Sequence, residues 1–419
     1  MTLAAATLLF LLCAKFLAAT ALELLNMRSV RAHAGCVPAA FAPFMDAESY
    51  AKSVSYTLDK SRFGIVEDFF NTAFLCLLLA FCALPAMFDF GTGAFGSSAF
   101  GQAVAIILIS IVLSAPDLPF ELYSQFVIEQ RYGFNKATLR LWIADKIKGL
   151  AVGLLFGAPI LTLILWFSDA FKSTWWIWGF LAVSLFQLAM IIVYPRFIMP
   201  LFNKFEELPE GELRSCLFAL ADRGGFAART IQVMDGSRRS SHSNAFFTGF
   251  GRFRKIVLFD TLVEQLARPE LEAVLAHEIG HYKRGHVVKM ICASMALTFA
   301  AFALMGWLGG SAWFYEGFGF RDSSGFGPII LMYSLFAGAF TFWLTPVVNA
   351  FSRGHEYEAD AFAARLCGSA DALKSALRKL HKKNLGNLTP HALYSAFYYS
   401  HPTLLERECA LDKCSQNEN

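Results

Sequence analysis

Residues 269–281 read Pro-Glu-Leu-Glu-Ala-Val-Leu-Ala-His-Glu-Ile-Gly-His, and an apolar stretch of membrane-spanning length follows at 287–309. His277 and His281 are four residues apart in a helix-forming context, so both imidazoles lie on one helix face and can reach the same metal ion. Glu278, between them, can act on a water bound to that metal. This H-E-x-x-H spacing is typical of zinc-dependent peptide hydrolysis, which needs neutral imidazole ligands, an open coordination position and a carboxylate base.

The composition of the chain indicates a membrane protein. Of its 419 residues, 56% are hydrophobic and only 16% are charged, whereas a soluble protein averages about 25% charged residues. The net charge of +3 is small and the chain has no long basic run, so we expect no nucleic acid partner. The nine cysteines are scattered and form no C-x-x-C pair, which argues against a disulfide framework or a cysteine zinc cluster.

Seven apolar stretches are long enough to cross a bilayer as helices, which takes about 20 residues. These stretches are 3–25, 69–88, 100–117, 148–168, 174–196, 287–309 and 327–350. The first is too long for the apolar part of a signal peptide, so we interpret it as a membrane helix. Because intramembrane charge is costly, we expect its Lys15 and Glu23 to be paired or to reach the membrane surface.

The loops between these stretches alternate in their content of basic residues. The segments 26–68, 118–147 and 197–286 and the tail after 350 are rich in Arg and Lys, whereas loop 89–99 has none. By the positive-inside rule, this pattern predicts an N-terminus outside and a C-terminus in the cytoplasm. The absence of long low-complexity tails favours a bacterial inner membrane over the endoplasmic reticulum membrane.

The predicted fold is a mainly α, multi-pass membrane protein of seven transmembrane helices with a small α+β cytoplasmic metalloprotease domain. Its predicted parts are five membrane helices with their loops in 1–196, a cytoplasmic segment at 197–286, two membrane helices in 287–350 and a helical cytoplasmic tail at 351–419. In the cytoplasmic segment, TIQVMD, NAFFTGF and KIVLFD predict short strands separated by GSRRS and GRFRK turns. We expect the helix that contains HEIGH to run straight into the sixth span.

Two histidines do not complete a catalytic zinc site, which takes three protein ligands and a water. The position six residues after His281, where metzincins have a third histidine, is Val287. A thermolysin-like glutamate about twenty residues further on is also missing, since no Asp or Glu occurs between Glu278 and Glu316. Both soluble-enzyme patterns are therefore excluded.

The next acids on the predicted cytoplasmic side are in Glu-Tyr-Glu-Ala-Asp, residues 356–360. Glu356 and Asp360 share a helix face, whereas Glu358 points away from it. We therefore predict that Glu356 is the third metal ligand and that Asp360 supports the site, for example by orienting a ligand histidine. The alternative is that this segment is a solvated, acidic start of a helix.

These motifs resemble the integral-membrane CAAX prenyl protease family, the type I class of seven-helix zinc metalloendopeptidases. The resemblance also includes SHSNAFFTGF (241–250), IVLFDTLVEQL (256–266), VIEQRYGFNKAT (127–138) and YYSHPTLLER (398–407). It extends from the third predicted loop to the tail. One departure is that Glu358 stands where glutamine is common in the family.

The resemblance implies that Glu356 completes a site for one zinc ion (Zn2+) per chain and that the helices ring a water-filled chamber. It implies cleavage near the C-terminus of a substrate, typically a prenylated protein that ends in C-a-a-X. It also implies that His401 and Arg407 donate to the developing oxyanion. From the residues alone, His401 could equally be a packed surface histidine, and Arg407 an ordinary helix charge.

The segment Asn244, Ala245 and Phe246 begins an apolar strand whose edge can pair with an extended substrate. The resemblance favours this interpretation over that of an internal strand. His242, His286 and His355 also lie near the motifs, and we assign none of them to zinc because three better ligands exist.

We therefore predict a zinc endopeptidase in which Glu278 takes a proton from the attacking water and delivers it to the leaving amine. The expected partners are a peptide or prenylated protein substrate and the lipid bilayer. One alternative is a zinc protease of membrane-protein quality control without prenyl specificity. Another is a transporter or channel with structural zinc, which would take a fourth protein ligand and would not need Glu278.

Overall fold

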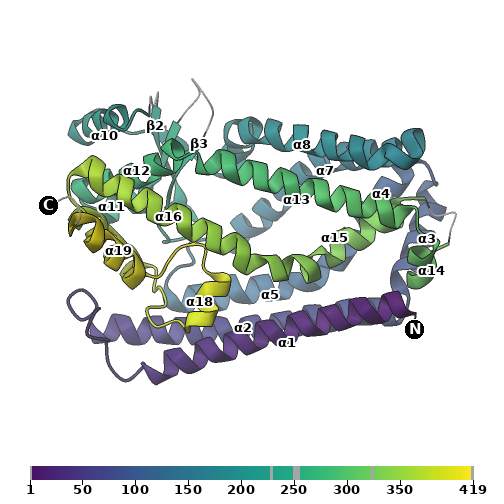
Figure 1. Ribbon diagram of the computed structural model, residues 1–419, viewed down its shortest axis with the longest axis horizontal. Coiled ribbons are helices and arrows are strands. Elements are labelled where there is room, and N and C mark those ends of the chain that lie inside the picture. Colours follow the sequence, from purple (N-terminus) through teal and green to yellow (C-terminus); the bar gives the residue numbers. More distant parts are fainter. Residues whose placement is uncertain (1, 227–229, 249–254, 322–324, 417–419) are drawn as a thin grey trace.

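The computed structural model describes residues 2–226, 230–248, 255–321 and 325–416. Long helices run along the molecule, and a small sheet with shorter helices forms the end that carries the C-terminus, opposite the N-terminus (Figure 1). The helices of the long bundle and its connections are α1 (Leu3–Ala32), α2 (Ala47–Ala80), α3 (Ala83–Phe95), α4 (Ala99–Ser114), α5 (Leu118–Tyr123), α6 (Gln130–Tyr132), α7 (Leu139–Phe171), α8 (Trp175–Val193), α9 (Met199–Phe202), α13 (His286–Gly309), α14 (Ala312–Phe318), α15 (Gly327–Thr341) and α16 (Thr345–Cys367).

Six helical stretches in the described part of the chain have the length and apolar composition to cross a membrane: Leu3–Ala32, Ala47–Ala80, Ala99–Tyr132, Leu139–Phe202, His286–Gly309 and Gly327–Cys367. The count differs from the predicted seven because Leu139–Phe202 contains two helices, α7 and α8, which pack against each other after a turn at Lys172–Thr174. The two predicted spans 148–168 and 174–196 both lie within this one stretch.

The prediction of one continuous helix across residues 69–88 was wrong. Helix α2 ends at Ala80, and Cys82 has a positive φ of 48° before α3 begins at Ala83. A positive φ is costly for a residue with a Cβ and cannot continue a helix. Hydropathy does not report this break because the apolar sequence continues through it.

Several predicted loops are largely helical. Helix α2 has 34 residues, which makes it about 50 Å long, whereas the hydrocarbon core of a bilayer is about 30 Å thick. Much of the basic segment 26–68 is therefore helix, and α2 is longer than it needs to be to cross the hydrocarbon core. Along the apolar parts of the bundle, large side chains are exposed: Phe10 is 70% exposed and Leu155 is 67% exposed. Such a surface suits contact with lipid.

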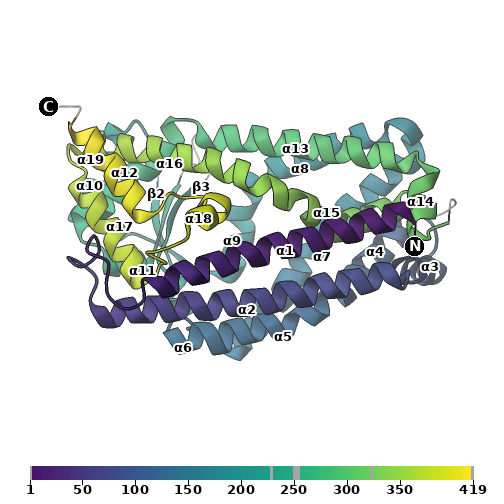
Figure 2. The same cartoon turned by 60° about the horizontal axis from the view of Figure 1, so that its bottom comes forward.

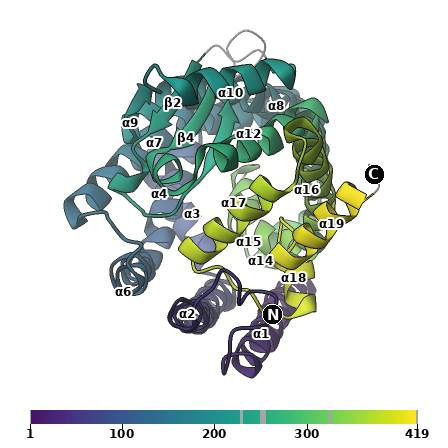
Figure 3. The same cartoon turned by 90° about the vertical axis from the view of Figure 1, so that its left-hand side faces the viewer.

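The long helices form a closed series of contacts. Neighbours pack in the order α2, α1, α15, α13, α8, α7 and α4, and α3 joins α4 back to α2. Figure 2 shows α1 and α2 side by side, and the end-on view of Figure 3 shows the helices distributed around the molecule. The charges expected to need partners have them: Lys15 pairs with Asp68 of α2, and Glu23 accepts a hydrogen bond from the Tyr394 hydroxyl at 2.9 Å.

The sheet has the strand order β1-β2-β4-β3. Its strands are β1 (Phe205–Glu207), β2 (Thr230–Met234), β3 (Ala245–Thr248) and β4 (Lys255–Phe259). Strands β2 and β4 are parallel, β1 and β3 are antiparallel to their neighbours, and β3 pairs Phe246 with Val257. The three predicted strands are present, and β1 is an additional one. The end of NAFFTGF and most of the predicted GRFRK turn lie outside the described residues.

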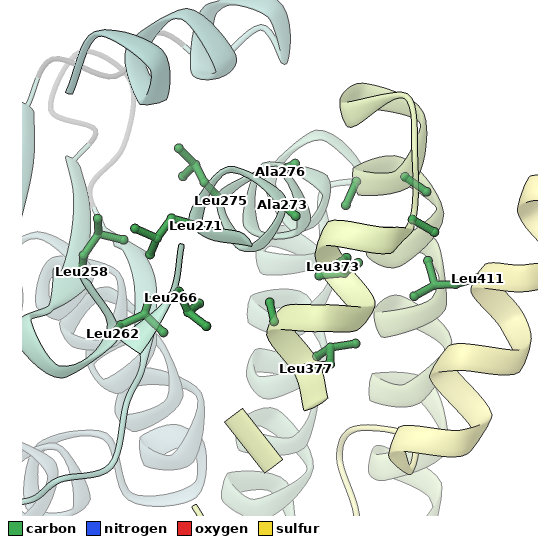
Figure 4. Close-up of a cluster of buried hydrophobic side chains, with 14 of the residues drawn as sticks. Leu258, Leu262, Leu266, Leu271, Ala273, Leu275, Ala276, Leu373, Leu377 and Leu411 are labelled. Atoms are coloured by element: carbon green, nitrogen blue, oxygen red, sulfur yellow. The ribbon is translucent and has the colours of Figure 1, made fainter. Parts of the chain in front are cut away.

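The remaining helices are α10 (Glu212–Arg223), α11 (Asp260–Gln265), α12 (Arg268–Lys283), α17 (Asp371–Lys383), α18 (Ala392–Tyr398) and α19 (Leu404–Gln416). Of these, α11 and α12 contact strands of the sheet, and α18 and α19 contact α16. One hydrophobic core joins α12, α17 and α19, with Leu271, Leu373 and Leu411 buried together (Figure 4). The tail therefore packs against the helix that contains HEIGH.

Helix α12 does not run straight into the sixth span, contrary to the prediction. It ends at Lys283, and Gly285, with φ of +67°, turns the chain before α13 begins at His286. Glycine adopts this left-handed conformation without the Cβ penalty of other residues. The turn gives α12 and α13 different directions and brings His286 back beside α12.

Candidate active site

Three side chains that can bind a metal meet between α12 and α16. His277 and His281 come from α12 and Glu356 from α16, and their ligand atoms all lie within 4.8 Å of one another. The two imidazole Nε2 atoms are 3.1 Å apart, and Glu356 oxygens lie 3.4 Å from Nε2 of His277 and 3.2 Å from Nε2 of His281. The structure thus brings together the three residues that the sequence indicated as ligands.

This triangle has the size of one face of a zinc tetrahedron. Nitrogen ligands about 2.0–2.1 Å from zinc in tetrahedral geometry are about 3.3–3.4 Å from one another. Moreover, Glu356 is only 3% exposed, and its Oε2 has no hydrogen-bond partner among the described residues. A buried carboxylate oxygen without a donor costs free energy, and a bound cation would remove that cost. The donor set, two imidazoles and a carboxylate, suits a catalytic zinc ion.

Gly280 explains how the two helices approach closely enough. A Cβ at this position would lie 3.0 Å from the Ala359 Cα and 3.1 Å from the Ala359 carbonyl oxygen of α16. Because these are backbone atoms, a larger residue would push α16, and with it Glu356, away from α12. Gly280 was not among the residues predicted from the sequence, although a glycine inside a helix costs about 1 kcal/mol relative to alanine and so indicates a packing constraint.

The Nδ1 atom of His277 is held by a buried ion pair. Asp360, 1% exposed, lies 2.8 Å from this Nδ1. The Arg407 guanidinium donates from both Nε and Nη2 to the Asp360 carboxylate, at 2.8 and 2.6 Å. Burial favours the neutral imidazole, but the hydrogen bond with Asp360 and the nearby carboxylate of Glu356 outweigh it and raise the pKa of the metal-free His277 to about 9.

Glu278 follows His277 on α12 and lies in a partly buried position. Burial raises the pKa of its carboxyl, while charges on His277 and His281 act in the opposite direction. A carboxylate with a raised pKa is a stronger base than an exposed one, which suits a group that must accept a proton from water.

The tail contributes two further residues, which the family resemblance indicated. His401 is 62% exposed, and its Nε2 lies 3.4 Å from Oε1 of Glu356. Arg407 is buried, and its Nη1 lies 3.7 Å from Oε2 of Glu356. His401 is therefore accessible beside the ligand carboxylate, whereas the guanidinium of Arg407 is bonded to Asp360 and points into the protein.

Asn244, Ala245 and Phe246 lie at the outer edge of the sheet. Strand β3 pairs with β4 on one side only, and no described strand pairs with its other edge. Asn244, just before the strand, is exposed, and its side-chain oxygen accepts from the Ala245 amide at 2.8 Å. Strand β3 also contacts α12, so its free edge belongs to the same end of the molecule as the His-His-Glu cluster.

Comparisons with known proteins match both halves of this arrangement. The family model for the CAAX prenyl protease N-terminal region, five membrane helices, matches residues 26–204, and that of peptidase family M48 matches residues 207–415.

Individual relatives match along most of their length. The chain is 39% identical to CAAX prenyl protease 1 of Saccharomyces cerevisiae over 405 residues, which is 89% of this chain and 88% of that protein. It is 34% identical to the human CAAX prenyl protease 1 homolog over 427 residues, 91% of this chain and 90% of that protein. The crystal structure of S. mikatae Ste24p covers 98% of this chain and all of its own, with a TM-score of 0.92 and 36% identity.

The cluster of two histidines and a glutamate thus lies in the part of the chain that matches peptidase family M48. In the sequence, this part follows the part that matches the membrane helices. This chain is a multi-pass membrane protein that belongs to the CAAX prenyl protease 1 group of peptidase family M48.

Proposed function

We propose that this protein is a zinc endopeptidase that cleaves prenylated C-a-a-X proteins near their C-termini. The observation that carries the proposal is the triangle of His277, His281 and Glu356 with Glu278 beside it. The names of the relatives, which are CAAX prenyl proteases, support the substrate class. Zinc at this site would supply a Lewis acid that polarises the scissile carbonyl and acidifies a water.

The residues around the metal position have separate roles in the reaction. Glu278 accepts the proton of the attacking water and returns it to the leaving amine. His401, exposed beside Glu356, donates to the oxygen on which negative charge develops. Arg407 holds Asp360 in place, and its charge also favours the developing oxyanion.

An extended substrate binds along strand β3. The free edge at Asn244, Ala245 and Phe246 offers backbone donors and acceptors, which recognise a peptide without reading its side chains strictly. The closed series of membrane helices surrounds a water-filled chamber through which the substrate reaches this edge. The reaction then takes place at the cytoplasmic side, with the N-terminus outside.

We infer the host membrane from the sequence alone. The sequence favours a bacterial inner membrane over the endoplasmic reticulum, and fractionation of the source cells distinguishes the two.

Cleavage of matched peptides tests the proposal. Purified protein is stripped with a chelator, reloaded with Zn2+, analysed for metal content and incubated with farnesylated and unfarnesylated versions of one C-a-a-X peptide. We expect one zinc per chain and faster cleavage of the farnesylated peptide. Equal rates would remove the prenyl specificity and favour a general membrane-protein protease. No cleavage of either peptide by zinc-loaded protein would refute the proposed function.

A further inference from the structure

The second ligand histidine, His281, also has a partner at its Nδ1 atom, and this partner is another histidine. The Nδ1 atoms of His281 and His286 are 3.0 Å apart. The other ring nitrogen of His286, Nε2, lies 3.2 Å from Oε2 of Glu358 on α16. His286 is 3% exposed, whereas the Glu358 side chain is 47% exposed. The three residues therefore form a chain of contacts from the metal position to the surface.

Only one placement of protons satisfies this chain with both rings neutral. The Nε2 of His281 faces His277 and Glu356 and must be free of hydrogen to bind a metal. Its Nδ1 therefore carries the proton and donates to Nδ1 of His286. With Nδ1 as an acceptor, the neutral His286 carries its own proton on Nε2 and donates it to Glu358.

Glu358 decides the direction of these hydrogen bonds. An ionised carboxylate can only accept, so it requires a proton on His286 Nε2 and leaves Nδ1 free to accept from His281. A glutamine at this position could present either its amide oxygen or its NH2 group. The carboxylate of Glu358 therefore specifies the tautomer of His286 more strictly than a glutamine would.

The packing holds His286 where it can act in this way. The turn at Gly285 places it at the first position of α13, beside His281 of α12. The His355 ring stacks on the His286 ring with centroids 4.0 Å apart and planes at 14°. His286 is thus fixed from one face by a ring and at both nitrogens by hydrogen-bond partners.

We propose that His286, oriented by Glu358, is a positioning residue that fixes the tautomer and ring orientation of His281 and so strengthens metal binding. This inference rests on the zinc site proposed above. Loss of such an outer partner of a zinc-bound histidine typically weakens metal binding or activity by about 10–100-fold.

Two substitutions at His286 separate hydrogen bonding from packing. His286→Asn keeps an acceptor, because its Oδ1 can take the position of Nδ1. His286→Phe keeps the ring and its stacking on His355 but has no acceptor. We expect zinc binding of the Phe variant to be weaker by about 10–100-fold, and that of the Asn variant to stay within about threefold of the original protein.

Glu358→Gln provides a second, exposed test that does not endanger folding. It should weaken zinc binding by about two- to fivefold, because the amide accepts less strongly than a carboxylate. His355→Phe is the matched control: it preserves the stacked ring. Among the described residues, the ring of His355 contacts that of His286 and not that of His281, so zinc affinity should change by less than about twofold.

The measurement is competition for Zn2+ between the full-length protein in detergent and a chelator of known affinity, with the visible spectrum of the Co2+-substituted protein as a second readout. The spectrum should shift in His286→Phe and not in His286→Asn, because only the former changes how His281 meets the metal. Equal losses in the Phe and Asn variants would assign His286 to packing alone, and unchanged affinity in the Phe variant would refute the proposal. Because affinity is measured without a peptide, zinc binding that responds as expected without any cleavage would refute the proposed function and leave this inference standing.

Discussion

The two ligand histidines are one helical turn apart on α12, yet their surroundings differ in kind. Nδ1 of His277 meets Asp360, which is fully buried and paired with the buried Arg407. Nδ1 of His281 meets His286 and then the half-exposed Glu358. We call these the His277 side and the His281 side of the site.

The difference has an energetic consequence. Removing one member of a buried ion pair leaves a charge without compensation, which is strongly destabilising. On the His281 side, water can replace the exposed carboxylate. We therefore expect the His277 side to contribute to the stability of the fold as well as to the metal site, and the His281 side to affect the metal almost alone.

The largest effect should come from Glu278, which lies between the two sides. Glu278→Gln removes the base and should lower kcat by about 10²–10⁴-fold, while zinc content stays the same because the ligands are untouched. Peptide cleavage and metal analysis on the same preparation check both parts. Undiminished hydrolysis with zinc bound would contradict the assignment of Glu278 as the base.

The next largest effect should distinguish the two sides directly. Arg407→Met removes both guanidinium hydrogen bonds from the buried Asp360 carboxylate, which then keeps only His277 as a partner, and should lower the free energy of unfolding by about 3–5 kcal/mol. Glu358→Gln, on the exposed end of the other side, should change it by less than about 0.5 kcal/mol.

Chemical unfolding in detergent, followed by circular dichroism, measures both variants. The double variant Arg407→Met with Asp360→Leu should regain part of the stability but bind zinc more weakly than Arg407→Met, because His277 then lacks its acceptor at Nδ1. Similar losses for Arg407→Met and Glu358→Gln would show that the two sides do not differ in this respect.

A smaller effect is expected where both sides depend on the distance between α12 and α16. Gly280→Ala places a Cβ against the backbone of Ala359 and should destabilise the protein by about 1–3 kcal/mol, with weaker zinc binding as Glu356 moves away. Gly354→Ala on α16 is the matched control, since its Cβ would meet nothing within 4 Å. If both variants bind zinc equally well, the close approach at Gly280 does not set the site.

The smallest change concerns pH. The pKa of the metal-free His277 is about 9, so below pH 9 its ring binds a proton that zinc must displace. Zinc affinity should therefore rise with pH, by at most about tenfold per unit between pH 6.5 and 8.5 for this one proton. Zinc-buffered titrations at several pH values measure the slope. A flat profile would mean that the metal-free His277 carries no second proton for zinc to displace from its Nε2.

The sequence predicted the membrane-spanning class and the three cluster residues for understandable reasons. Apolar composition and helix-face spacing are local properties, and the absence of acids between Glu278 and Glu316 left few candidates for the third ligand. The break at Cys82 and the turn at Gly285 were not predicted correctly. Hydropathy averages over many residues and does not respond to the φ angle of one of them.

Other features depend on contacts between distant segments. Strand β1 has only three residues and forms by pairing with β2. The edge position of β3 follows from the strand order of the whole sheet. Neither the presence of β1 nor the edge position of β3 can be predicted from the residues of those strands alone.

By itself, the sequence determined that the chain is a membrane protein with a two-histidine metal motif, because hydrophobicity and helical periodicity act within one segment. Only the tertiary structure decided what surrounds those histidines. The close packing at Gly280 brings α16 to α12, the tail delivers Arg407 to Asp360, and the turn at Gly285 returns His286 to His281. Each of these contacts joins segments whose distance depends on how the entire chain packs.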